Sequence, residues 1–153
     1  MNTAYTVVDL QQNTTEWLEW RGNGIGASDA PAIMGENPWK SASQLLSEKL
    51  GSVRKFEGNA AMARGTELEP EARKQYEAIS KTHVVPACLQ SNKYEWQRAS
   101  VDGLAVNGNA VVEIKCGDSV YKKTASSRQV PGYYVGQLQH ILAVTELPHI
   151  DFF

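Results

Sequence analysis

The chain has 153 residues, of which 42% are hydrophobic and 21% charged, proportions that are typical of a single folded domain. No segment is apolar enough to cross a membrane, and the polar N-terminus lacks the hydrophobic stretch of a signal peptide, so we expect a cytoplasmic protein. The net charge of −2 argues mildly against a protein that coats nucleic acid by charge, and the two cysteines lack the spacing of a zinc site.

The first third of the chain is predicted to form short helices joined by glycine-containing loops. Residues that favour helix N-termini precede three segments, and Gly51 follows the last of them. The predicted helices cover residues 14–20, 28–34 and 43–50.

The glycine-rich segment 22–26 lies between Arg21 and Ser28. A helix that opens at Ser28 would present free backbone N–H groups and the positive end of its dipole, so this loop is suited to bind a phosphate. The guanidinium of Arg21 would add a bidentate contact. The alternative is a flexible turn with a surface arginine, and the residues alone favour neither.

A longer helix is predicted over residues 66–80, where Thr66 and Glu69 have the spacing of a capping box and Pro70 is typical of a first helical turn. Strands are then predicted over residues 83–90, within 93–106 and over 110–116, followed by a helix over 131–145 and the start of a strand at 149–153. This order of elements predicts an α/β fold.

One predicted hairpin carries most of the functional information. Its Asn107-Gly108 pair lies between two alternating apolar runs and predicts a two-residue type I′ turn. In that register Asp102 lies opposite Glu113, and the two side chains leave the same face. Lys115 follows Glu113 by two residues and shares this face. A three-residue loop would instead turn Asp102 to the other face.

Two carboxylates that face each other repel unless something neutralises them, and a divalent cation would do so. Mg²⁺ is commonly held by one or two carboxylates together with water and phosphate oxygens. Beside such an ion, Lys115 could orient or deprotonate a water molecule, or stabilise charge on a reacting phosphate. The alternative is a solvated polar hairpin face on which Glu113 and Lys115 form an ordinary pair.

Asp102, Glu113 and Lys115 resemble the PD-(D/E)xK nuclease signature, with Val101 in place of its proline. Six sequence blocks follow the order found in the lambda exonuclease/YqaJ-type phage recombination nucleases, to which most of the chain is similar. The blocks are WLEWR at 17–21, GASD at 26–29, RGTELE at 64–69, VDGL at 101–104, EIKC at 113–116 and YVGQLQ at 134–139.

This resemblance implies a restriction-endonuclease-like α/β core of order αβββαβ, in which helices flank a mixed sheet. One domain would span residues 1–153. Because members of the family continue beyond this point, we expect the last strand to be truncated in this chain or shortened in a compact variant.

The resemblance also implies a metal site. Mg²⁺, or Mn²⁺ in its place, would be held by Asp102, Glu113, the backbone carbonyl of Ile114 and Glu69. Local sequence by itself favours a capping role for Glu69, whereas the family places a metal-ligating or water-positioning glutamate at this position.

Further residues are implied to act on the substrate. Gln137 would hold Lys115 or the attacking water, and Arg21 with Ser28 would bind a terminal 5′-phosphate. The segment between the last hairpin strand and the final helix is predicted to be a mobile loop that contacts the DNA backbone, although such charges are commonly only solvated. Its basic residues are Lys122, Lys123 and Arg128.

The implied activity is 5′→3′ digestion of duplex DNA ends by a phage or prophage protein that supports homologous recombination in the bacterial cytoplasm. The implied partners are double-stranded DNA, a single-strand annealing protein and two further copies of the chain in a toroidal homotrimer. Two alternatives are open, an endonuclease of the same fold and a module that binds DNA ends without cleaving them. The presence of Asp102, Glu113 and Lys115 argues against the second.

Overall fold

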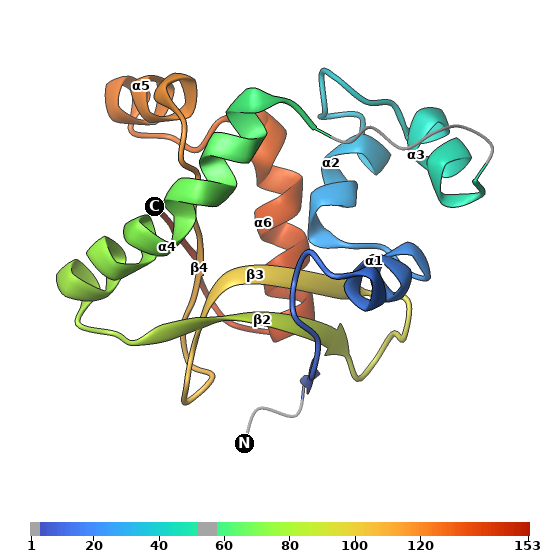
Figure 1. Cartoon of the computed structure of the whole chain (residues 1–153), viewed down its shortest axis with the longest axis horizontal. Coiled ribbons are helices and arrows are strands. Elements are labelled where there is room, and N and C mark those ends of the chain that lie inside the picture. Colours follow the sequence, from blue (N-terminus) through green and yellow to red (C-terminus); the bar gives the residue numbers. More distant parts are fainter. Residues whose placement is uncertain (1–3, 52–57) are drawn as a thin grey trace.

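A computed structural model describes residues 4–51 and 58–153 of the chain. Its centre is a five-stranded sheet in which the strands follow their order in the sequence (Figure 1). All neighbouring strands are antiparallel except β4 and β5, which are parallel. The strands are β1 (Tyr5–Val8), β2 (Val84–Ser91), β3 (Arg98–Ala105), β4 (Val111–Glu113) and β5 (Asp151–Phe152).

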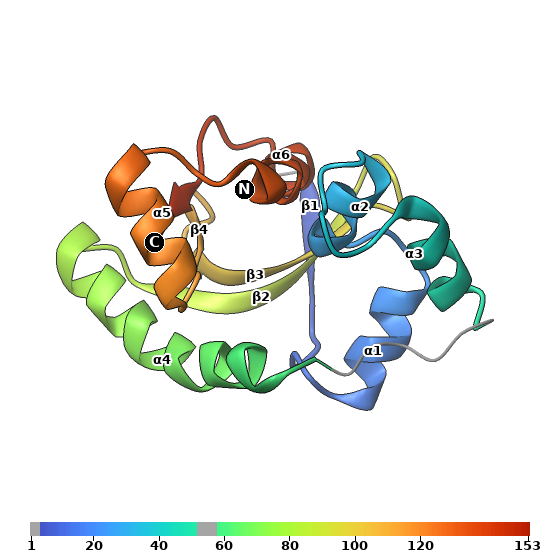
Figure 2. The same cartoon turned by 90° about the horizontal axis from the view of Figure 1, so that it is seen from above.

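Helices cover both faces of this sheet, and Figure 2 shows the two longest, α4 and α6, on opposite sides of β2 and β3. The same view places α1, α2 and α3 together at one end of the molecule and α5 at the other. The helices are α1 (Thr15–Gly22), α2 (Ala30–Ile33), α3 (Ala42–Lys49), α4 (Ala60–Ser80), α5 (Asp118–Ser127) and α6 (Gly132–Thr145), with a 3₁₀ turn at Ala27–Asp29. The predicted restriction-endonuclease-like arrangement, a mixed sheet flanked by helices, is confirmed.

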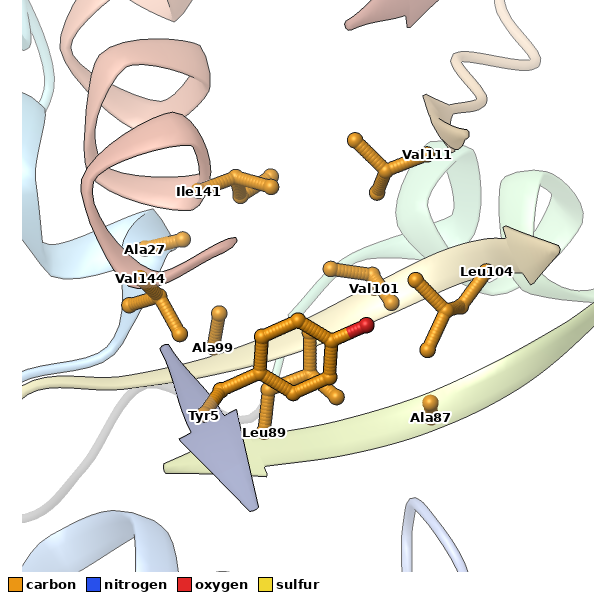
Figure 3. Close-up of a cluster of buried hydrophobic side chains, with 10 residues drawn as sticks. All are labelled: Tyr5, Ala27, Ala87, Leu89, Ala99, Val101, Leu104, Val111, Ile141 and Val144. Atoms are coloured by element: carbon orange, nitrogen blue, oxygen red, sulfur yellow. The ribbon is translucent and has the colours of Figure 1, made fainter. Parts of the chain in front are cut away.

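The apolar core has a part on each face of the sheet. Beneath α6, the fully buried Ile141 and Val144 pack against side chains from β1 to β4 (Figure 3). Beneath α4, Tyr76 packs against the opposite face of β2, β3 and β4. Val111 and Val112 show why both faces are apolar, since successive strand residues point to opposite faces and each of these two enters a different cluster.

The register of the hairpin formed by β3 and β4 is as predicted, because Gly103 pairs with Val112 and Leu104 with Val111. The predicted type I′ turn is wrong. Such a turn needs a positive φ at both central residues, and in this turn only Gly108 has one, of 70°. The loop has four residues, 106–109, and is closed by a hydrogen bond from the N–H of Ala105 to the carbonyl of Ala110 at 2.9 Å. It has the same midpoint as the predicted turn, so the strand pairing is unchanged.

Two further predictions of local structure are corrected, and one strand was not predicted. Helix α4 begins at Ala60, where Asn59 accepts the N–H of Met62 at 3.0 Å, and not at Thr66 with a capping box, so Pro70 lies inside the helix. The alanine-rich segment before Thr66 has a high helix propensity and extends the helix upstream.

The segment predicted as a loop after the hairpin is largely helix α5, with Asp118 in its first turn and Arg128 as its left-handed C-cap. Strand β1 was not predicted at all, since only four residues form it and its pairing with β2 is remote in the sequence. The predicted helix over 131–145 and the strand near the end of the chain are confirmed as α6 and β5.

Strand β5 fixes the segment that follows β4. The N–H of Phe153 donates to the carbonyl of Glu113, and the N–H of Lys115 donates to the carbonyl of Phe153, both at 2.9 Å. The E-x-K sequence is therefore held on one side by β3 and on the other by the last residues of the chain. Within the two described ranges, no helix is long and apolar enough to span a membrane.

Candidate active site

The hairpin places Asp102 and Glu113 side by side at the junction of β3 and β4. Asp102 is half-buried, and its Oδ2 accepts the N–H of Ile114 at 2.8 Å. Glu113 is almost entirely buried, with 2% of its surface exposed. The predicted juxtaposition of the two carboxylates is therefore present, and the polar face they form is not a solvated one.

The two oxygens of Glu113 have different surroundings. Oε1 accepts hydrogen bonds from Nζ of Lys115 at 2.5 Å and from Nε2 of Gln137 at 2.7 Å. Oε2 is buried and has no hydrogen-bond partner among the described residues. A buried acceptor without a donor is rare in proteins and costs free energy, so it indicates a position that a ligand fills.

Burial shifts the acid–base behaviour of these groups. Burial, and to a smaller extent the charges of Asp102 and Glu69, raise the pKa of Glu113 to about 7, although Lys115 opposes the shift. Burial also raises the pKa of Asp102. For Lys115, burial lowers the pKa, but the charges of Glu113 and Asp102 outweigh it and the net shift is upward. Lys115 is thus an ammonium that donates hydrogen bonds.

These features fit a divalent cation. The unpartnered Oε2 of Glu113 and the mutual repulsion with Asp102 are both relieved by a positive ion between the two side chains. Among the described residues, no three acidic, histidine or cysteine side chains are arranged as a ready-made metal cluster. The carboxylates that the hairpin brings together therefore need a further ligand, for which the backbone carbonyl of Ile114 stays a prediction.

Glu69 lies on α4 and is paired with the guanidinium of Arg73, one helical turn further on. Nε of Arg73 also donates to the backbone carbonyl of Asp102 at 2.7 Å, which ties α4 to the site. Burial and the charge of Asp102 raise the pKa of Glu69. A ligand role for Glu69 would require this carboxylate to exchange Arg73 for the ion, and it stays a prediction.

Gln137 lies on α6 and is buried at the centre of the site. Its amide donates to Glu113, whereas the resemblance implied contact with Lys115 or a water molecule. In this structure Gln137 and Lys115 share one carboxylate oxygen, so Gln137 orients the lysine only through Glu113.

Arg21 and Ser28 are brought together as predicted. The guanidinium of Arg21 donates to the hydroxyl of Ser28 and lies 4.9 Å from the centre of the Trp17 ring. The predicted helix start at Ser28 is wrong. Ser28 lies in a 3₁₀ turn before the four-residue helix α2, and Asp29 already accepts the N–H of Gly26 at 2.9 Å. A phosphate would therefore meet side chains here rather than a free helix end.

A single cleft joins these two groups of residues. It has a volume of about 170 Å³, and its lining contains both the group of Asp102, Glu113, Lys115 and Gln137 and the pair of Arg21 and Ser28. Sequence reasoning missed five other residues of its lining. They are Gln12, Trp17, Trp20, Arg98 and Ser100.

The missed residues are held by contacts between distant parts of the sequence. Nε1 of Trp17 donates to Oγ of Ser100 at 2.8 Å, and Nε2 of Gln12 donates to the carbonyl of Val101 at 3.1 Å. Trp17 was within a matching sequence block, and its position four residues before Arg21 on α1 was the one local signal.

Comparisons with known proteins show which proteins the chain is similar to. The chain is 34% identical over 137 residues to an uncharacterized protein, YqaJ, of Bacillus subtilis, covering 88% of this chain and 43% of that protein. The chain thus spans less than half the length of this relative. The crystal structure of an alkaline exonuclease from Laribacter hongkongensis is 30% identical and superimposes with a TM-score of 0.72, over 91% of this chain and 72% of that one.

A second crystal structure of the alkaline exonuclease, in complex with dAMP, superimposes with a TM-score of 0.74 at the same identity and coverage. Residues 16–148 match the YqaJ-like viral recombinase domain, and this range contains both groups of cleft residues. The chain therefore belongs to the family of YqaJ-like viral recombinase domains.

Proposed function

We propose that this chain is a metal-dependent deoxyribonuclease that digests duplex DNA from 5′-phosphorylated ends in the 5′→3′ direction. The observation that carries the proposal is the single cleft that unites the Asp102–Glu113–Lys115 group with Arg21 and Ser28. The similarity to an alkaline exonuclease supports it, as does the dAMP complex of that protein, because an exonuclease releases nucleoside monophosphates. The annealing partner and the homotrimer that the resemblance implies belong to the same proposal.

In this mechanism, Asp102, Glu113 and the carbonyl of Ile114 would hold Mg²⁺ or Mn²⁺, and Glu69 would join them on release from Arg73. The bound ion would polarise the phosphate and lower the pKa of a water molecule. Lys115, kept positively charged by the two carboxylates, donates a hydrogen bond to the attacking water or to a phosphate oxygen as charge develops there.

Gln137 keeps the carboxylate of Glu113 in place, since its amide donates to Oε1. In the same cleft, Arg21 and Ser28 contact the terminal phosphate. A terminal phosphate carries more negative charge than an internal one, and a guanidinium fork is well suited to distinguish them. The distance between this pair and the Asp102–Glu113–Lys115 group would then set which bond is cleaved.

Cleavage should depend on Asp102 and on a free DNA end. With Mg²⁺, we expect the wild-type protein to degrade linear duplex DNA and to leave closed circular duplex intact. Asp102→Asn should lower the rate of degradation by at least about 100-fold, because one of the two carboxylates is lost. Asp9→Asn, an exposed position outside the cleft, is the control. A gel assay decides between outcomes. Cutting of the circle would favour an endonuclease, and binding of ends without cutting would leave only a DNA-binding module.

Arg21→Ala should abolish the preference for a 5′-phosphate. Loss of a charge-assisted contact to the phosphate should slow digestion of 5′-phosphorylated duplex by roughly 10- to 100-fold and leave 5′-hydroxyl duplex nearly unaffected. The comparison is initial rates on the two substrates. Lys74→Ala removes an exposed positive charge from α4 and should change neither rate. A mutant that keeps the wild-type preference would contradict the phosphate role of Arg21.

The metal-free protein should become less stable as the pH rises. The pKa of Glu113 is about 7 in the folded chain, above its ordinary value of 4.5, so the stability it contributes is present below pH 4.5 and lost as the pH passes 7. This loss is up to about 3 kcal/mol. Glu113→Gln removes the titrating group, so its melting temperature at pH 8 should exceed that of the wild type without metal.

Thermal unfolding between pH 5 and 8 measures this difference, with the exposed Glu71→Gln as control. Mg²⁺ should raise the melting temperature of the wild type at pH 8 and have little effect on Glu113→Gln. Parallel stability profiles for the two proteins would show that Glu113 is an ordinary exposed carboxylate and would remove the physical basis of the metal site.

A further inference from the structure

Tyr134, on α6, lies against the catalytic lysine. Nζ of Lys115 is 5.0 Å from the centre of the Tyr134 ring, while a second side of the ammonium contacts Oε1 of Glu113 at 2.5 Å. The lysine side chain is 22% exposed and lines the cleft. The ammonium therefore has a carboxylate and an aromatic face as neighbours, and its remaining side is open to the cleft.

The Tyr134 ring is itself held by aromatic neighbours. The ring of Tyr133 meets it edge-on at 4.7 Å, and the ring of Phe152 lies at 5.8 Å. Phe152 belongs to β5 and is paired with Glu113 across the β4–β5 ladder. The tyrosine thus packs against the strand pair that the lysine directly follows.

The spacing along α6 matches the spacing along the strand. Tyr134 and Gln137 are three residues apart, so they share one face of the helix. Glu113 and Lys115 are two residues apart on an extended segment and also share a face. Gln137 contacts the glutamate and Tyr134 contacts the lysine, so one helix face holds both functional residues of E-x-K.

We propose that Tyr134 is a positioning residue that holds the ammonium of Lys115 at the mouth of the cleft through its ring face, an inference that rests on the proposed nuclease function. A cation is attracted to the face of an aromatic ring, and lysine has a flexible stem that otherwise gives the ammonium many orientations. Without the ring, the ammonium remains paired with Glu113 but is free to turn away from the reacting phosphate.

The activity test distinguishes the contribution of the Tyr134 ring from that of its hydroxyl group. Tyr134→Leu should lower kcat about tenfold with KM for duplex DNA unchanged, because only the orientation of Lys115 is lost. Tyr134→Phe keeps the ring and should stay within about twofold of the wild type. Tyr94→Leu removes another tyrosine ring that faces a lysine, Lys93 at 5.2 Å, but that does not line the cleft, and serves as the control. An unchanged kcat in Tyr134→Leu, a change confined to KM, or equal losses in the leucine and phenylalanine variants would overturn the proposal.

A spectroscopic test does not depend on activity. Protons on the ε-carbon of a lysine that lies over an aromatic ring shift upfield. Lys93 over Tyr94 and Lys123 over Tyr133 should give such signals too, so the signal of Lys115 is the shifted one that is missing from Lys115→Met. The shift should persist in Tyr134→Phe and vanish in Tyr134→Leu. If the wild type degrades no DNA, the proposed function fails, and this comparison still decides whether Tyr134 holds Lys115. An unshifted Lys115 signal would overturn the contact.

Discussion

The buried carboxylate of Glu113 is the constraint on which the rest of the structure depends. Glu113 is 2% exposed and is the last residue of β4. The two other residues of this strand, Val111 and Val112, belong to the apolar core. Placing a carboxylate there raises its pKa to about 7 and leaves one oxygen without a partner among the described residues. An apolar residue would stabilise the fold more, so the cost indicates a functional role.

Neighbouring elements each contribute one contact that keeps this group in position. Strand β5 pairs with the backbone of Glu113, α6 supplies the amide of Gln137, and Arg73 of α4 donates to the carbonyl of Asp102. Helices on both faces of the sheet and the last strand therefore converge on the same two residues of the hairpin. Rigid support of this kind is what a site requires if it is to hold two like charges close together.

Local patterns predicted the central part of the site, and contacts across the chain determined the rest. The Asn107-Gly108 pair marked the midpoint of the hairpin, so the pairing of Asp102 with Glu113 followed even though the turn type was wrong. The start of α4 depends on an upstream helical segment whose extent the local capping pattern concealed. Ser100 had no local signal, because its contact with Trp17 spans most of the domain.

The most direct test of this account is the pKa of Glu113, measured from its side-chain carboxyl carbon by ¹³C NMR as the pH is changed. The account predicts a pKa of about 7 in the metal-free protein and a value below the ordinary 4.5 when Mg²⁺ is saturating, because the ion stabilises the ionised carboxylate. A Glu113 that titrates near 4.5 without metal, or whose titration does not respond to Mg²⁺, would contradict it.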